Sequence, residues 1–446
     1  MYAENKIAHW VASLDLAQIS APALAVAETC LFDGIGVAIA GRATDVFGRC
    51  SALVRSPHDV SSAAFMTGVA IHALDYDDTC YAGIVHGTAA VLPAVLAVCE
   101  HLDGDGQLLL ESFVAGVEAL YAIGDAVTDS FYTSGHWSTT ALGILGATCG
   151  AAKAFGLDAA QTAHALRLAA NMPLGLRASH GSNAKPYLNG VAARLGVEAA
   201  LAARAGIEGS PGTLEGRFGF AAVQNAGIWH DERLGRLGQT WGLIDPGIAI
   251  KRHPLCSAAQ AAIEATIALR AAHAITPEDV VSVDCRATAL VVNCLTYPTP
   301  ETIAQAQFSM SFAIACAIAF GDVGLAHLRV DVLRSAAVAQ LITRVGLRED
   351  RALVPPEQLT QAPEGAAVTM TLSDGRVVTH TVLAAAGMPS RPLTREHLTA
   401  KFFDCAQFGG VDTQRATVLA QQLQNVARIA HVRQLTQLAS SEIRAA

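Results

Sequence analysis

The chain has 446 residues, of which 52% are hydrophobic and 15% are charged, and its formal net charge is −9. A chain of this length exceeds the usual size of a single hydrophobic core, so it predicts two domains. The apolar composition excludes a disordered protein. An acidic chain without a run of Lys or Arg argues against a nucleic-acid partner.

The cysteines and the N-terminus indicate a cytoplasmic protein. The ten cysteines show no C-x-x-C spacing, and several lie in apolar runs, as free buried thiols do. The first residues lack the basic flank and the apolar core of a signal peptide, and no uncharged apolar stretch is expected to approach the roughly 18 residues of a membrane span. We therefore expect reduced cysteines, no zinc site and no membrane partner.

Apolar residues recur at three- and four-residue intervals through most of the first 265 residues, which is typical of amphipathic helices. Asp158 and Gln161 form an N-cap pattern, and Gly106, Gly156 and Gly206 lie where helices are expected to end. The many small residues suit closely packed helices. The predicted helices span residues 7–16, 21–39, 61–75, 88–102, 108–128, 139–155, 159–172 and 185–205.

The pattern changes in the last third of the chain. Residues 280–287 alternate β-branched and polar side chains as a strand does, and residues 367–382 predict a hairpin that turns at Asp374 and Gly375. The other expected elements are helices at 308–320 and 331–342, a polar loop at 348–364 and helical structure from 395 onward.

These elements define the predicted fold class, which is mainly α with an α+β second domain. The large all-helical domain comprises residues 1–265 and is completed by residues 396–446. The smaller α+β domain, residues 266–395, has antiparallel strands. Because the chain leaves the first domain and re-enters it, the inserted domain is expected to act as a lid.

The most polar segment of this apolar chain runs from Asp75 to His86. Three aspartates, a threonine and a histidine precede an apolar helix there, and polar groups at this density are costly to bury unless they are paired. The segment is therefore expected to line a cleft. Three further polar clusters stand in apolar surroundings, at residues 134–140, 180–186 and 251–254.

Each of these polar residues also has a structural interpretation. One or two of the three aspartates are expected to cap a helix, His136 equally fits a buried core histidine, and Lys185 fits a solvated first-turn lysine. His180 and His253 are interpreted as structural. The spacing of the histidines and Asp75 matches no familiar zinc or iron pattern, so no metal site is predicted.

The four clusters, in this order and followed by residues 305–309 and 387–394, resemble the MmgE/PrpD family. This family includes 2-methylcitrate dehydratase, cis-aconitate decarboxylase and iminodisuccinate epimerase. The similarity runs from residue 21 to residue 408. It implies a helical domain with a smaller α+β lid, a homodimer, and an active site between the domains that uses no cofactor.

The resemblance also implies roles for individual residues. The D-[FY]-D-D-T motif places Asp75 among the catalytic residues and Thr79 among the substrate-binding residues. His86 matches the histidine of the stretch that follows, and His136 matches the histidine of G-[FYW]-H-x-T. Lys185 matches the lysine of T-K-P. All three are expected to be catalytic.

Three more residues complete the expected site. Lys251 matches the lysine of K-x-[YF]-P, and with Arg252 it is expected to bind substrate carboxylates. Tyr297 best matches a catalytic tyrosine between the first lid strand and the F-S helix. The chain departs from the family pattern at Gly87-Thr88 in place of Pro-Ser and at Cys80-Tyr81 in place of Trp-His. Where the family has Tyr-Pro-Cys-Cys, it has His253-Pro-Leu-Cys256.

These residue types suit proton transfer at a carbon next to a carboxylate, where cations and hydrogen-bond donors stabilise the charged intermediate. The altered first loop disfavours a methylcitrate site, and within the family the sequence as a whole most resembles iminodisuccinate epimerase. This resemblance makes cofactor-independent epimerisation of a small di- or tricarboxylate, iminodisuccinate, the leading expectation. The alternatives are dehydration of a 2-methylcitrate-like substrate and decarboxylation of a cis-aconitate-like substrate. A non-catalytic metabolite-binding protein is the minority alternative.

Overall fold

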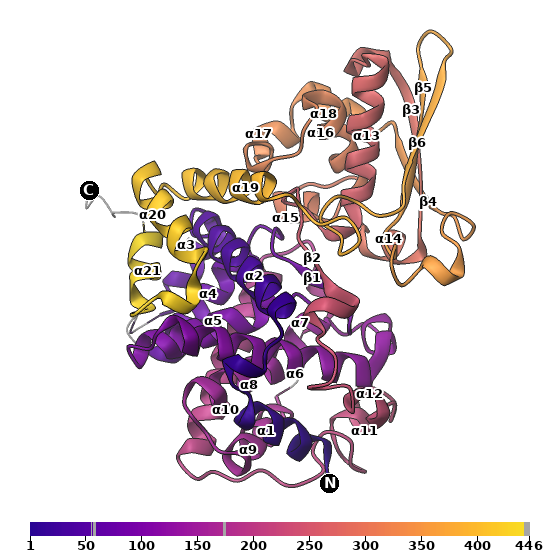
Figure 1. Ribbon diagram of the computed structural model, residues 1–446. Coiled ribbons are helices and arrows are strands. Elements are labelled where there is room, and N and C mark those ends of the chain that lie inside the picture. The colour runs from indigo at the N-terminus through magenta and orange to yellow at the C-terminus, as the bar shows by residue number, and fades with distance from the viewer. Residues whose placement is uncertain (55, 57–58, 173–174, 441–446) are drawn as a thin grey trace.

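The computed structural model describes residues 1–54, 56, 59–172 and 175–440. It shows a large helical domain and a smaller domain built on a four-stranded sheet, with a hydrophobic core in each (Figure 1). The predicted fold class, mainly α with an α+β second domain, is therefore confirmed.

The helical domain is formed by the first helices of the chain together with the last three. Every helix predicted between residues 7 and 205 has a counterpart, and the prediction over 139–155 is divided between two helices. The helices are α1 (Ala3–Ser13), α2 (Ala21–Gly41), α3 (Asp45–Ser51), α4 (Val60–His72), α5 (Gly87–His101), α6 (Gly106–Thr133), α7 (Ser138–Ala141), α8 (Gly143–Ala154), α9 (Ala159–Ala169), α10 (Ala184–Arg204), α11 (Phe220–Gln224), α12 (Asp231–Leu234), α19 (Arg395–Phe408), α20 (Thr413–Leu423) and α21 (Arg433–Ala439).

Small residues bring these helices into close contact. At the crossing of α4 and α10, a Cβ atom added to Gly68 would lie 2.9 Å from the Cα atom of Gly190. Because even alanine would push the two backbones apart, the crossing requires glycine. It holds Lys185, in the first turn of α10, beside the end of α4.

The predicted helix ends are correct in all but one case. Asp158 and Gln161 form a capping box at the start of α9, and Gly156 and Gly206 have φ angles of 69° and 88° after the ends of α8 and α10. The prediction for Gly106 is wrong, because this glycine begins α6 behind an Asp105 N-cap. A side chain on Gly106 would collide with the carbonyl oxygen of Val426, so close packing selects glycine there.

The α+β domain places helices against a sheet whose strand order is β4-β3-β5-β6. The predicted strand and hairpin are confirmed, since β3 pairs antiparallel with β5 and β5 pairs antiparallel with β6. The pair β3–β4 is parallel, and β4 was not predicted. The elements are α13 (Gln260–His273), β3 (Val280–Ala287), α14 (Ala289–Cys294), α15 (Ile303–Ala306), α16 (Met310–Phe320), α17 (Val330–Leu333), α18 (Ala336–Ile342), β4 (Val345–Glu349), β5 (Ala366–Leu372) and β6 (Val377–Val382).

The chain passes between the domains earlier than residue 265. Ala261, Ala262 and Ile263 of α13 belong to the core of the α+β domain, so the whole of this helix lies in the second domain. After β6 the chain returns, and α19 lies along α2 (Figure 1). An ion pair of 2.7 Å between Lys401 Nζ and Asp33 Oδ1 fixes that return.

Two helices, α2 and α6, are long and apolar enough to cross a membrane by length and composition alone. Helix α2 carries Glu28 and Asp33, and α6 carries Glu118 and Asp125, so neither is the uncharged apolar stretch that the sequence analysis excluded. The most apolar windows of α2 and α6 are 67% and 83% buried inside the protein, which is typical of core helices in a soluble protein. The ten cysteines are all free and buried.

Candidate active site

The polar segment Asp75–Asp78 is buried between the end of α4 and strand β1 (Thr79–Cys80). Strand β1 pairs antiparallel with β2 (Ile248–Ala249), and this pairing brings Lys251 to the segment. Asp75 has a φ angle of 49°, which is uncommon for a residue other than glycine. A strained, buried, charged residue is a frequent feature of active sites.

Two buried lysines share the carboxylate of Asp75. Lys185 Nζ lies 3.0 Å from Asp75 Oδ1, and Lys251 Nζ lies 2.8 Å from the same oxygen. Lys185 also donates to His72 Nε2 at 2.6 Å, and Lys251 donates to the backbone oxygen of Asp75 at 2.7 Å. An ammonium group has three N–H donors, so within the described part of the chain each lysine keeps one donor for a ligand.

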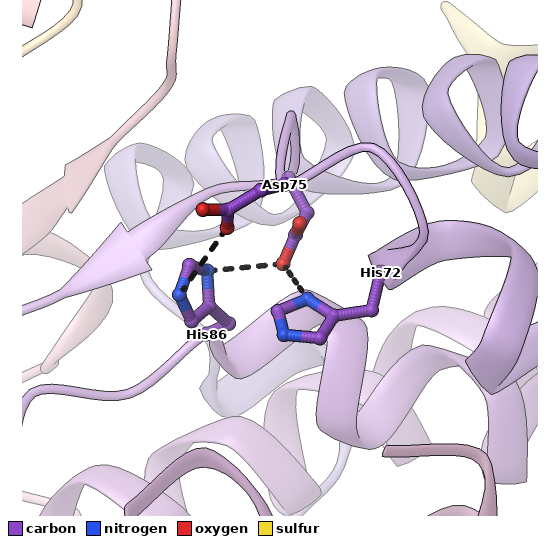
Figure 2. A group of neighbouring side chains, drawn as sticks. His72, Asp75 and His86 are labelled. Carbon is purple, nitrogen blue, oxygen red and sulfur yellow. Dashed lines mark hydrogen bonds and ion pairs between the residues drawn. The ribbon is translucent and has the colours of Figure 1, made fainter. Parts of the chain in front are cut away.

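Two histidines flank a second carboxylate, that of Asp77. Figure 2 shows His72 and His86 turned toward the loop that carries Asp75. His72 Nδ1 lies 2.9 Å from Asp77 Oδ2, and His86 Nδ1 lies 3.0 Å from the same oxygen. His86 Nδ1 also lies 2.7 Å from the backbone oxygen of Asp78.

These partners define which imidazole nitrogen carries the proton. Both partners of His86 Nδ1 are acceptors, so Nδ1 carries the hydrogen and Nε2 keeps its lone pair. His86 Nε2 lies 3.9 Å from Asp75 Oδ1 and belongs to a side chain that is 14% exposed, whereas the Asp75 side chain is 2% exposed. His86 therefore presents an unprotonated nitrogen on the accessible side of the cluster.

The charges follow from burial and from these contacts. Burial by itself would raise the pKa of Asp75, but the ammonium groups of Lys185 and Lys251 hold this pKa well below its usual range. Burial lowers the pKa of His72 to about 4 and also lowers the pKa of His86. At neutral pH the cluster thus holds an ionised carboxylate between ammonium groups, with neutral imidazoles beside them.

Aromatic rings from both domains close over the cluster. Trp137 stacks on His72 at 5.2 Å between ring centroids, and Phe308 of the α+β domain stacks on His180 at 4.9 Å. The hydroxyl of Tyr297, also from the α+β domain, donates to the backbone oxygen of His180 at 2.8 Å. Lys185 Nζ lies 5.3 Å from the Trp137 ring centroid, so the rings shield the charged groups from water.

Several polar atoms on this wall are buried without a hydrogen-bond partner among the described protein atoms. They include Asp75 Oδ2, Thr79 Oγ1 and His180 Nε2. Buried polar atoms are normally paired, so an unpaired group in a charged pocket indicates a position where a ligand binds. The substrate contact expected for Thr79 stays a prediction.

The structure brings Asp75, Lys185, Lys251 and His86 together, but it does not bring His136 or Arg252 to them. The His136 ring stacks on Phe131, and its nitrogens face Ser134 and Gln224 at 3.1 Å and 3.2 Å. The Arg252 side chain is exposed, although its backbone oxygen accepts from Tyr76. The roles predicted for His136 and Arg252 stay predictions, and these contacts do not support them.

Sequence reasoning missed His72 and the part played by Asp77, and it assigned His180 a structural role. His72 is the last residue of α4, so its place in an apolar helix concealed it. The sequence did contain a signal for His72. It lies three residues before Asp75, and where a helix ends between two such residues, both side chains can face the loop that follows. The interpretation of the aspartates as helix caps holds in part, since Asp78 accepts from the backbone N–H of Thr88 in the first turn of α5.

His72, Asp75, Asp77 and His86 offer ligand atoms within 4.8 Å of one another, a spacing that a metal ion could use. The charges around them argue otherwise. The ammonium groups of Lys185 and Lys251 already lie within 3.0 Å of Asp75 and would repel a divalent cation. The donor set therefore fits a cation-lined pocket for an anion better than a metal centre.

The chain thus has a helical domain, a smaller α+β domain and a buried lysine–histidine–aspartate cluster covered by aromatic rings from both domains, which defines a class of two-domain proteins. The MmgE/PrpD N-terminal domain matches residues 5–228, and the MmgE/PrpD C-terminal domain matches residues 253–425. The chain therefore belongs to the MmgE/PrpD family, as the sequence motifs indicated.

Its relatives include proteins named cis-aconitate decarboxylase. The protein of that name from Mus musculus is 26% identical over 400 residues, which cover 83% of this chain and 80% of the relative. The one from Homo sapiens is 26% identical over 402 residues, which cover 83% of this chain and 81% of the relative. The one from Aspergillus terreus is 29% identical over 291 residues, which cover 58% of this chain and 59% of the relative.

Proposed function

We propose that this protein is a cytoplasmic, cofactor-independent lyase that decarboxylates a small tricarboxylate of the cis-aconitate type. The observation that carries the proposal is the pair of ammonium groups on Asp75 beside the unprotonated Nε2 of His86. The names of the relatives support decarboxylation over the epimerisation expected from the sequence. The ten unpaired, buried cysteines support a reducing compartment.

The cluster supplies what such a reaction needs. Lys185 and Lys251 each keep one N–H donor for a substrate carboxylate, and their charge stabilises the carbanion-like intermediate. The carbon–carbon bond to the departing carboxyl group breaks, its electron pair stays on the substrate, and carbon dioxide leaves. A proton then adds to the substrate from Lys185, or from solvent through His86, whose unprotonated Nε2 first accepts it, while Asp75 holds the lysines in place.

The remaining predicted residues receive roles from their positions. Thr79 Oγ1 would donate to a substrate carboxylate, because it is buried and has no described partner. Tyr297 would hold the His180 loop against the cluster through its bond to the His180 backbone oxygen. This is a positioning role, and it differs from the direct catalysis expected from the sequence.

Epimerisation remains the second candidate, because more than one group able to accept or donate a proton adjoins Asp75. His86 Nε2 lies 3.9 Å from Asp75 Oδ1, and Lys185 Nζ, which donates to His72, lies 3.0 Å from the same oxygen. A two-base epimerase requires a base and an acid on opposite faces of one carbon. The same arrangement serves an iminodisuccinate-type substrate.

Proton NMR in D2O with cis-aconitate, citrate, 2-methylcitrate and iminodisuccinate separates these reactions. Decarboxylation of cis-aconitate releases carbon dioxide and leaves one deuterium in the product. Dehydration forms an alkene. Epimerisation replaces one C–H with C–D and releases neither carbon dioxide nor water. We expect decarboxylation, and we expect His86→Asn to lower kcat by about 10²- to 10⁴-fold.

The matched control is His9→Asn, which alters an exposed histidine of α1 and should leave kcat unchanged. Epimerisation without carbon dioxide release would overturn the lyase assignment in favour of the second candidate. Saturable binding without turnover of any of the four compounds would favour the non-catalytic alternative.

A further inference from the structure

A cavity of about 510 Å³ opens between the two domains at the C-terminal end of α6. Its helical-domain wall includes Tyr132 and Arg177, and its α+β wall includes Leu290 and Asn293. The volume is in the range of pockets that hold small molecules. The residues of the cluster around Asp75 do not line this cavity, so it is a neighbouring space.

Arg177 is the one cationic side chain among the residues that line the cavity. Its guanidinium stacks on the ring of Tyr132 at 4.2 Å, and its Nη2 donates to the backbone oxygen of Asn293 at 2.7 Å. Its Nε is buried and has no hydrogen-bond partner among the described residues. The cavity also has one acid, Asp129, which is exposed at the rim and is influenced by Arg233.

The contacts of Arg177 leave its guanidinium oriented and able to bind a planar anion such as a carboxylate. A guanidinium carries five N–H donors, and the contacts above occupy one of them. None of the ion pairs in the described part of the chain involves Arg177. The ring of Tyr132 and the Asn293 carbonyl hold the guanidinium in a fixed orientation, so little side-chain entropy is lost when a carboxylate binds in the bidentate geometry that arginine favours.

The cavity and the Asp75 cluster share a wall. Arg177 begins the short turn that ends at His180, the residue that stacks on Phe308. Burial and Lys185 lower the pKa of His180, Asp75 raises it, and Arg177 lowers it further, so charges of the cluster and of the cavity both act on this imidazole. On the other side, Tyr81 lines the cavity and donates to Glu364 at 2.7 Å. The short turn from Arg177 to His180 therefore connects the lining of the cavity to the rings that cover the Asp75 cluster.

We propose that Arg177 binds the substrate carboxylate that is most remote from the reacting carbon, and so selects tricarboxylates over dicarboxylates. This assignment deepens the proposed function and rests on its polycarboxylate substrate. Lys185 and Lys251 hold the carboxylate groups at the reacting end, and the guanidinium of Arg177 holds the third. A dicarboxylate that occupies the lysine end leaves Arg177 without a ligand.

The test compares Arg177→Gln and Arg177→Lys with the wild-type protein by titration calorimetry at constant ionic strength. The ligands are tricarballylate, a saturated tricarboxylate, and glutarate, a dicarboxylate. We expect Arg177→Gln to raise the Kd for tricarballylate by about 10- to 100-fold and to change the Kd for glutarate by less than about threefold. Arg177→Lys should have an intermediate effect, because it keeps the charge but loses the bidentate geometry.

Arg348→Gln is the matched control, because Arg348 is an exposed arginine of β4 paired with Asp284. It should bind both ligands as the wild type does. In turnover of a tricarboxylate, Arg177→Gln should raise KM and change kcat by less than about threefold, whereas a merely structural role would lower kcat and thermal stability together. Should Arg177→Gln fail to fold, the selective loss in Arg177→Lys decides the question.

Unchanged tricarballylate affinity in Arg177→Gln, or an equal loss of both ligands, would overturn the role of Arg177. Wild-type protein that binds neither ligand would overturn it as well. Wild-type protein that binds tricarballylate through Arg177 but does not turn over cis-aconitate would overturn the proposed reaction and leave the role of Arg177 standing.

Discussion

Replacing Asp75 with Asn tests whether one carboxylate organises the site. The substitution preserves shape but removes the negative charge that accepts from Lys185 Nζ at 3.0 Å and from Lys251 Nζ at 2.8 Å. Both ammonium groups are buried, with 4% and 2% of the residue surface exposed, so neither is compensated by water. Breaking a buried ion pair costs roughly 3–5 kcal/mol, and we expect Asp75→Asn to lower the free energy of unfolding by that amount.

The assay pairs urea unfolding at pH 7 with kcat for the preferred substrate. We expect kcat to fall at least about 100-fold, because the lysines lose the group that holds them. A saturating tricarboxylate should restore part of the stability, since its carboxylates replace the missing anion and bind the folded state only.

Glu4→Gln provides the matched control. Glu4 forms a buried ion pair of 3.2 Å with Arg167 in the helical domain, outside the cluster. This variant should lose stability to a similar degree and keep its kcat within about twofold of the wild-type value. If Asp75→Asn unfolds within about 1 kcal/mol of the wild type, or keeps full activity, the carboxylate does not organise the site and the reasoning is wrong.

Four further outcomes are expected. Because burial lowers the pKa of His86, the acid limb of kcat/KM should lie below pH 6.5, and an acid limb above that value would contradict a neutral His86 that relays the proton through Nε2. Burial raises the pKa of Asp78 from 3.8 to about 7. Between about pH 4 and pH 7 the folded protein keeps this proton and the unfolded chain loses it, so the free energy of unfolding of the wild type should fall as the pH rises. In urea unfolding, the free energy of unfolding of Asp78→Asn minus that of the wild type should rise by up to roughly 4 kcal/mol over this pH range, and a difference that does not change with pH would refute the raised pKa. Activity should survive dialysis against a strong chelator, whereas loss that a divalent metal restores would refute the metal-free site. Sedimentation at micromolar concentration should show a homodimer, because Phe218 and Val223 are 83% and 67% exposed, and a monomer would count against the expected assembly.

Local patterns in the sequence were sufficient for most secondary structure. A helix repeats every 3.6 residues and a strand every two, so the periodicity of the apolar residues marked the long helices, strand β3 and the hairpin at Asp374. Strand β4 was not predicted because it forms by pairing with β3, a parallel strand far away in the sequence. The paired residues Val283 and Val345 are 62 residues apart. Only Val345 and Leu347 of its five residues are half-buried, and the other three are exposed, so its apolar alternation is too short to mark a strand.

The sequence by itself determined the family and four members of the charged cluster, because the motifs around Asp75, His86, Lys185 and Lys251 are specific. Only the tertiary structure decided which side chains meet. The ladder between β1 and β2 and the glycine crossing of α4 and α10 bring both lysines to one carboxylate. The end of α4 adds His72, and the turn before His180 carries Arg177 to the neighbouring cavity. Distances between residues far apart in the chain follow from packing, and a pattern of spacing cannot contain them.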